Sequence, residues 1–254
     1  MSEDPIDESW KIAAEMELYE DLSEDEHGFP EADIRDLLTR EDFAPKLVEA
    51  VMGTLGFKDG DFVEHEHGFL GYRARFEKDD AIYLSPVFEG EEHQIDLPTF
   101  SDEFLAQSGL ERKSIVFQLH THPSTMGLLS DVVFRRSKEH TNRHMLRFSE
   151  GDLKNLIILA EREDSALIQG VAVHTGKRRG QLLLANFRSW DALQDFDPRV
   201  VYSRQTTRLR AGADPYEAYR EAGLNVAVVK FDMRTGQLDK KDVDRATKIL
   251  SQRE

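Results

Sequence analysis

The sequence predicts an α/β (α+β) fold in which a central mixed β-sheet is flanked by helices. First, 254 residues are enough for one domain with elaborations, whereas two large domains are not expected. Second, apolar residues cluster in short runs, as in 114–119 and 156–160, which is typical of a globular core. Third, extended segments alternate with segments of helical spacing, as in layered α/β proteins.

The N-terminal part is predicted to be acidic at first and then helical. Residues 1–38 are interpreted as an acidic extension, in which a helical pattern already begins near Pro30. A second helix is expected to start near residues 39–42 and to end at Gly56, because glycine commonly follows the last turn of a helix.

The middle of the chain is rich in predicted strands. Extended segments separated by turn-forming residues are expected at 62–76, 81–88, 94–97 and 114–122, with a short helix at 101–107. The segment 114–122 is very apolar, so we expect it to be a buried strand.

The second half alternates helices and strands. A helix is predicted from about Gly151 to Glu163, with Ser149 as its N-cap. Strands at 166–173, 182–187 and 225–231 follow, and the last helix is expected at 239–250. The C-terminal elaboration, 191–254, would either recognise a partner or complete the sheet.

Charge and composition exclude several classes of function. The chain has 33 Lys and Arg against 49 Asp and Glu, a formal net charge of -16, so nucleic acid is not an expected partner. The acidity is interpreted as a well-solvated surface, with attraction of a basic partner as the alternative. The absence of cysteine excludes disulfides, thiolate metal sites and a cysteine nucleophile. With no apolar run of about 20 residues and no signal-peptide pattern, we expect a cytoplasmic protein that does not enter a membrane.

Two histidines at the end of the apolar strand point to a metal site. His120 and His122 are two residues apart, so their imidazoles face the same side of a strand, and Pro123 then ends the strand. A catalytic zinc site needs a third protein ligand and an open position for water. The other closely spaced pair in a predicted strand, His65 and His67, is interpreted as lying around the site without binding the metal, or as exposed.

These residues resemble the JAMM (MPN-plus, Mov34/JAB) zinc metalloproteases of the archaeal type. That family carries His-x-His-Pro at a strand end and Ser-x-x-Asp at the start of a helix. The chain has His120-Thr121-His122-Pro123 and then Phe148-Ser149-Glu150-Gly151-Asp152. The resemblance implies a cytidine-deaminase-like MPN fold over residues 39–190, with Zn²⁺ held by His120, His122 and Asp152.

The resemblance leaves two assignments open. Ser149 and Asp152 require an insertion at about 128–147 relative to the usual spacing, whereas Ser130 and Asp131 would need none but are out of register. The family's general base precedes a glycine-containing strand, and here the chain offers Glu66 or Glu64. We prefer Glu66, with Ser149 as the hydrogen-bond donor to the oxyanion.

The implied activity is zinc-dependent hydrolysis of a peptide or isopeptide bond. Substrates implied by the family are peptides or conjugates in which a ubiquitin-like modifier is joined to lysine. Two alternatives remain: a catalytically inactive MPN-type scaffold that only binds partners, and a small-molecule amide hydrolase on the same fold. Neither the oligomeric state nor the individual substrate follows from the sequence.

Overall fold

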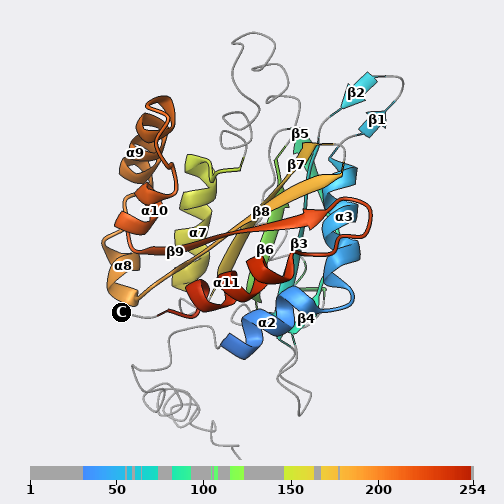
Figure 1. Ribbon diagram of the computed structural model, residues 1–254, viewed down its shortest axis with the longest axis horizontal. Coiled ribbons are helices and arrows are strands. Elements are labelled where there is room, and N and C mark those ends of the chain that lie inside the picture. Colours follow the sequence, from blue (N-terminus) through green and yellow to red (C-terminus); the bar gives the residue numbers. More distant parts are fainter. Residues whose placement is uncertain are drawn as a thin grey trace, which may run out of the picture.

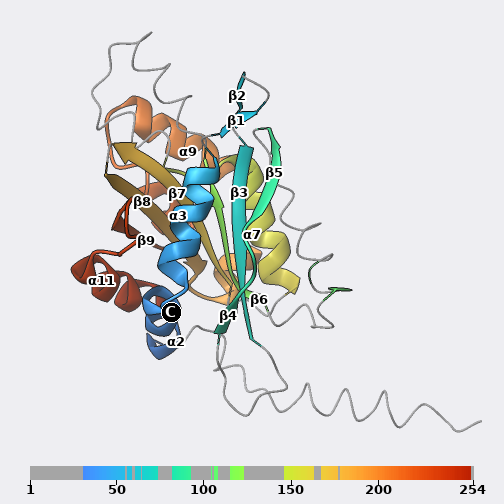
Figure 2. The ribbon, with the colours of Figure 1, turned by 90° about the vertical axis from the view of Figure 1, so that its right-hand side faces the viewer.

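The computed structural model describes residues 31–54, 56–58, 61–63, 65–73, 82–92, 104, 106–107, 115–122, 146–162, 167–176 and 178–252 (Figures 1 and 2). The helices described are α2 (Glu31–Thr39), α3 (Phe43–Gly53), α7 (Glu150–Arg162), α8 (Trp190–Gln194), α9 (Pro198–Arg210), α10 (Glu217–Glu221) and α11 (Lys240–Leu250). The strands are β1 (Gly56–Lys58), β2 (Asp61–Val63), β3 (His65–Arg73), β4 (Ile82–Leu84), β5 (Phe88–Glu92), β6 (Ile115–Thr121), β7 (Ile168–Gly176), β8 (Arg179–Phe187) and β9 (Leu224–Asp232).

A mixed seven-stranded sheet forms the centre of the molecule. Its order is β4-β3-β6-β7-β8-β9, with β5 also paired to β3, while β1 and β2 form a separate hairpin pair. β6 and β7 run parallel, and the other pairs in the main sheet are antiparallel. A parallel pair needs a crossover connection, and α7 lies in this one. The predicted α/β class with a central mixed sheet is therefore confirmed.

Helices cover both faces of the sheet (Figures 1 and 2). On one face, apolar side chains from α2, α3, α11 and alternate strand positions form a buried cluster, which includes Ile34, Phe43, Phe69, Phe117, Leu184 and Val229. On the other face, α7 to α10 pack over a second cluster, which includes Leu70, Phe148, Leu156, Val171, Leu183 and Tyr219. The two-residue alternation of strands thus supplies two cores from one sheet.

Most of the helices and strands predicted from residue 114 onward are confirmed. The strands predicted at 114–122, 166–173, 182–187 and 225–231 correspond to β6 to β9, and the helices predicted at 151–163 and 239–250 to α7 and α11. The long extended segment predicted at 62–76 contains two elements, β2 and β3, and the segment at 81–88 holds β4 and the start of β5. The strand predicted at 94–97 lies outside the described residues.

The N- and C-terminal regions contribute to the same body. Residues 1–30 lie outside the described part of the chain, but 31–38, the end of the predicted acidic extension, belongs to α2, whose apolar side packs into the core. The 191–252 region contains three helices that the sequence did not predict, α8, α9 and α10. Because β9 pairs with β8 along nine residues, this region completes the sheet.

β9 forms one edge of the sheet, and the chain that follows it covers part of that edge. The Lys230 N–H donates to Asp242 Oδ2 over 3.2 Å, and the Asp239 N–H donates to the Lys230 carbonyl over 2.8 Å. Two residues further along, the Asp232 N–H donates to the Gln237 carbonyl over 3.0 Å. Backbone groups that would otherwise face solvent at a sheet edge therefore have partners here.

Within the described residues, no helix combines the length and apolar character needed to cross a membrane.

Candidate metal centre

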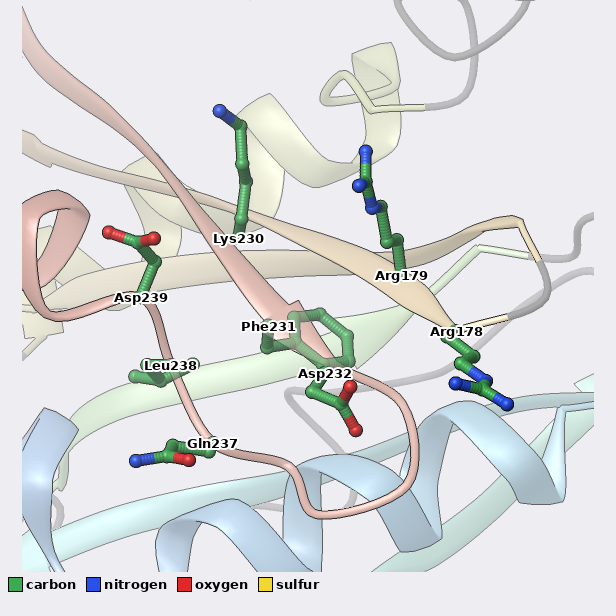
Figure 3. A pocket seen from close by; sticks show the side chains of 8 residues that line it. All are labelled: Arg178, Arg179, Lys230, Phe231, Asp232, Gln237, Leu238 and Asp239. Carbon is green, nitrogen blue, oxygen red and sulfur yellow. The ribbon is translucent and has the colours of Figure 1, made fainter.

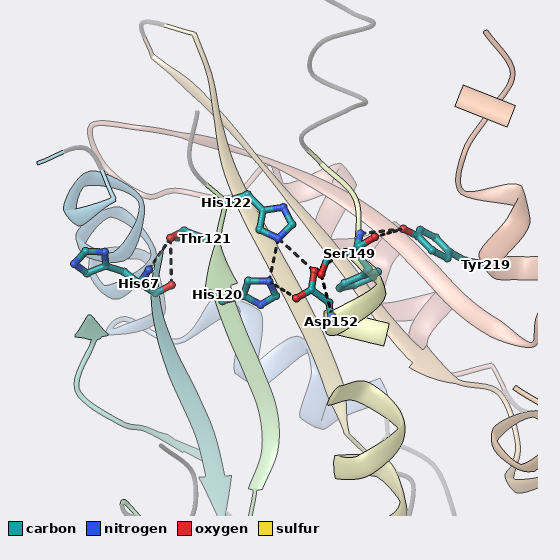
Figure 4. Close-up of polar contacts among 8 residues, drawn as sticks. His67, His120, Thr121, His122, Ser149, Asp152 and Tyr219 are labelled. Atoms are coloured by element: carbon teal, nitrogen blue, oxygen red, sulfur yellow. Dashed lines mark hydrogen bonds and ion pairs between the residues drawn. The ribbon is translucent and has the colours of Figure 1, made fainter. Parts of the chain in front are cut away.

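The candidate site lies where β6 ends and α7 begins (Figure 4). Every residue of β6 is buried, and His120 and His122 leave its C-terminal end on the face covered by α7. α7 starts on the same side, so its first turn meets the two imidazoles. The carboxyl end of a strand and the N-terminus of the helix that packs on it are a common place for ligands in α/β sheets.

Two histidines and one aspartate converge at this point. His120 Nε2 lies 3.1 Å from Asp152 Oδ1, and His122 Nε2 lies 3.3 Å from Asp152 Oδ2. The two Nε2 atoms are 3.2 Å apart. Because the three ligand atoms lie within 4.8 Å of one another, this group could hold a metal ion. Two imidazoles and one carboxylate are donors that zinc accepts, and water would complete a four-coordinate site.

Asp152 is held by the N-terminal cap of its own helix. The Asp152 N–H donates to Ser149 Oγ over 3.0 Å, and the Ser149 N–H donates to Asp152 Oδ2 over 2.6 Å. This reciprocal pair has the form of a capping box, with aspartate at the third helical position in place of the usual glutamate. One local motif in the sequence thus both starts α7 and orients the carboxylate.

The environment of Asp152 favours its charged form. Burial opposes ionisation, but the charge and hydrogen bond of His120, followed by those of His122, outweigh it and hold the pKa of Asp152 well below its ordinary value. Asp152 is therefore a carboxylate at neutral pH, as a metal ligand must be.

Glu66 shares the face of the two histidines. β3 is antiparallel to β6 with Gly68 opposite His120, so two-residue alternation turns Glu66 toward the side of His122. Its side chain is buried. Glu64, the alternative, lies outside the described residues.

Thr121 ties β3 to the end of β6 from the opposite face. Its Oγ1 accepts from the His67 N–H over 2.9 Å and donates to the His67 carbonyl over 3.2 Å, and it also bonds to the hydroxyl of Thr54, the residue that caps the C-terminus of α3. The backbone of His67 therefore belongs to the frame of the site (Figure 4).

The C-terminal region braces the segment that leads into α7. The Tyr219 hydroxyl accepts hydrogen bonds from the Phe148 N–H over 2.9 Å and from the side chain of Gln205. Nearby, the Tyr216 hydroxyl donates to the Leu146 carbonyl over 3.0 Å. Burial raises the pKa of Tyr219 well above its ordinary value, so its hydroxyl stays protonated. Sequence patterns gave no signal for this brace (Figure 4).

A second feature that the sequence analysis missed is a buried glutamine beside the site. Gln169, in β7, is fully buried, as is His120 in β6. The side-chain oxygen and nitrogen of Gln169 have no hydrogen-bond partner among the described residues. The same holds for the Nδ1 atom of His120. A polar residue within an otherwise apolar strand was the available signal.

A cavity of about 660 Å³ lies where β8 begins and β9 ends (Figure 3). Its lining consists of Arg178, Arg179, Lys230, Phe231, Asp232, Gln237, Leu238 and Asp239. The three candidate ligands, His120, His122 and Asp152, are not among these lining residues.

The structure thus brings together three predicted ligands, with Ser149 beside them and Glu66 on their face of the sheet. The alternative pair, Ser130 and Asp131, and most of the predicted insertion at 128–147 lie outside the described residues. Comparisons with models of protein families, with curated proteins and with solved structures gave no match.

Proposed function

We propose that the chain is a zinc-dependent hydrolase of the JAMM type that cleaves a peptide or isopeptide bond. The observation that carries the proposal is the convergence of His120, His122 and Asp152 at a buried strand end. The buried Glu66 on the same face supports it, because hydrolysis needs a general base beside the metal. A mixed sheet with ligands on β6 and α7 is compatible with the cytidine-deaminase-like fold that the family implies.

The donor set fits zinc. His120 and His122 are histidines held at one end of a strand, and Asp152 is ionised, so no ligand has to unfold or move far to bind. Zinc in this site would supply the Lewis acid that makes a neighbouring water molecule acidic enough to lose a proton near neutral pH.

The remaining groups have separate tasks. Glu66 would take the proton of the attacking water at its carboxylate and later pass it to the leaving amine. Ser149 Oγ accepts the Asp152 N–H and keeps its own hydroxyl proton, which it would donate to the oxyanion of the substrate carbonyl. As in the family, the substrate would be a ubiquitin-like tail joined to lysine, or a peptide.

The decisive experiment combines metal analysis with an activity measurement on the full chain. We expect about one zinc per chain by elemental analysis, and hydrolysis of a lysine-linked ubiquitin-like fusion that His122→Ala abolishes. Zinc without any hydrolysis would favour the inactive scaffold. Cleavage of small amides alone would favour the small-molecule hydrolase, and the absence of zinc would contradict the metal centre itself.

A further inference from the structure

The two ring nitrogens of the buried His120 differ in their surroundings. Its Nε2 atom faces Asp152 and His122, whereas Nδ1 has no hydrogen-bond partner among the described residues, although the residue is fully buried. An imidazole that binds a metal through one nitrogen carries its proton on the other, and that N–H almost always donates to an acceptor. A metal on Nε2 therefore requires an acceptor near Nδ1.

Gln169 is a buried side chain near His120 in the sheet that has an acceptor to offer. It is fully buried in β7, and both its amide oxygen and its amide nitrogen lack partners among the described residues. Other buried amides make hydrogen bonds, as Asn186 does to the Leu250 carbonyl over 2.9 Å. Because polar atoms in an apolar cluster are nearly always satisfied, an amide with neither atom bonded calls for a partner.

The register of the sheet brings these two groups together. In the parallel pair, His120 lies beside Val171, so Gln169 is the diagonal neighbour of His120 and faces the same side. With strands about 4.8 Å apart and a rise of about 3.3 Å per residue, the two Cα atoms are about 8 Å apart. Two long side chains can span that distance directly or through one buried water molecule.

Gln118 is the competing candidate, since it lies directly beside Gln169 in the register and two residues before His120. Its side-chain oxygen has no hydrogen-bond partner among the described residues either, although the residue takes part in another interaction. Gln169 is preferred because neither of its two amide atoms is bonded, whereas in Gln118 the oxygen alone is unbonded.

We propose that Gln169 is a positioning residue for the metal centre. Its side-chain carbonyl accepts the hydrogen bond of His120 Nδ1–H, which fixes the tautomer with the Nε2 lone pair toward the metal and holds the ring in the plane that meets Asp152. The inference rests on the proposed zinc site and adds a residue to it that does not touch the ion.

The test compares Gln169→Leu and Gln169→Glu with the unchanged chain. Zinc affinity is measured by competition with a chromophoric chelator, and the His120 tautomer is read from the ¹⁵N and ¹H resonances of the zinc-loaded protein. Removing such an outer partner typically weakens metal binding by about 10- to 100-fold, which is the loss expected for Gln169→Leu. Gln169→Glu keeps an acceptor, so its zinc affinity should equal or exceed that of the unchanged chain, with Nδ1 protonated.

Gln118→Leu serves as the matched control, because it removes the same type of buried amide from the neighbouring strand. Its zinc affinity should not change. A loss in Gln118→Leu but not in Gln169→Leu would overturn the proposal, as would a Gln169→Leu protein with the affinity and the tautomer of the unchanged chain. If Gln169→Leu does not fold, Gln169→Met, of equal length, takes its place. An unchanged chain that binds no zinc would instead refute the metal centre.

Discussion

Two single side chains at the end of β6 supply two of the three candidate metal ligands. His122 is half-buried and follows the last residue of β6, so its removal leaves the sheet and both apolar clusters intact. The Nε2 atom of His122 faces the Asp152 carboxylate. When His122 is removed, that carboxylate keeps a single imidazole partner, His120.

We therefore expect His122→Ala to yield a folded protein that is metal-free and inactive, since two remaining ligands do not make a zinc site. Elemental analysis and hydrolysis assays measure the two effects, and circular dichroism checks the fold. His174→Ala is the matched control: this histidine lies in β7 outside the ligand group, so zinc should remain. Full activity in His122→Ala would refute the mechanism.

Ser149 has two roles that different measurements can separate. Ser149→Ala removes the side-chain cap of α7, which should cost about 1 kcal/mol of unfolding free energy. It also removes a donor to the oxyanion, for which a loss of about 100- to 1,000-fold in kcat is expected. Urea unfolding and steady-state kinetics give the two values.

The conservative change Ser149→Thr keeps both the cap and the hydroxyl, so stability and rate should fall only slightly. If kcat falls no further in Ser149→Ala than in Ser149→Thr, Ser149 does not donate to the oxyanion and only caps the helix.

Among single residues, the sequence predicted which three side chains would lie together as a group that could hold a metal ion. His120 and His122 were recognisable because an apolar run preceding an i, i+2 pair defines both the strand and the face. Asp152 was proposed through the Ser-x-x-Asp element of the family resemblance, in a segment where Ser149 was also predicted to be the N-cap of a helix. Gln169 was not, because its relation to His120 arises from the pairing of strands that are about fifty residues apart in the chain.

At the scale of elements, helices α9 and α10 support the start of α7. The Phe148 N–H, one residue before the Ser149 cap, is bonded to the hydroxyl of Tyr219 in α10, and Gln205 in α9 donates to the same oxygen. The candidate metal ligand on α7, Asp152, thus depends on a region that is distant in sequence.

Tyr219→Phe should weaken both the fold and the metal site. The change leaves a buried Phe148 N–H without a partner, which costs about 1–3 kcal/mol of unfolding free energy. It also loosens the segment that orients Asp152, so zinc affinity should fall. Denaturant unfolding and chelator competition measure the two effects.

Tyr216→Phe is the control for this brace. Its hydroxyl donates to the Leu146 carbonyl, but the side chain is only half-buried, so water can replace the lost donor at little cost. Equal losses of zinc affinity in the two variants would show that the Tyr219 contact has no special relation to the site.

The three unpredicted helices show where periodicity fails. Along α9 the buried residues are Val201, Gln205 and Leu209, four positions apart, as expected for one helical face. The central residue of the three, Gln205, is polar and donates a hydrogen bond to Tyr219. It therefore interrupts the apolar pattern by which a helix is recognised in the sequence. α8 and α10 have five residues each, too few for a helical period to be visible.

For the whole molecule, the metal should add stability without being required for folding. The two apolar clusters lie on either side of the sheet, and the ligands are already held by hydrogen bonds and charge. Zinc at about 100 times its dissociation constant would contribute about 2.7 kcal/mol, and about 5–10 °C in Tm for a chain of this size.

We therefore expect EDTA to lower the Tm by that amount while the far-ultraviolet circular dichroism below the transition stays native. Scanning calorimetry with and without the chelator measures the shift, and His122→Ala should show none. Complete unfolding in EDTA would instead indicate a fold that requires its metal.

Because the edge of β9 is partly covered, we expect it to resist pairing with a second copy of the chain. An open edge strand offers unpaired N–H and C=O groups to another chain, which can extend the sheet into an aggregate. Asp242 occupies the Lys230 N–H at this edge and is itself held by Arg245 over 2.8 Å. In Asp242→Ala that N–H becomes free, so light scattering should detect concentration-dependent oligomers that the unchanged chain does not form. A single carboxylate on α11 would then keep one sheet from continuing into the next.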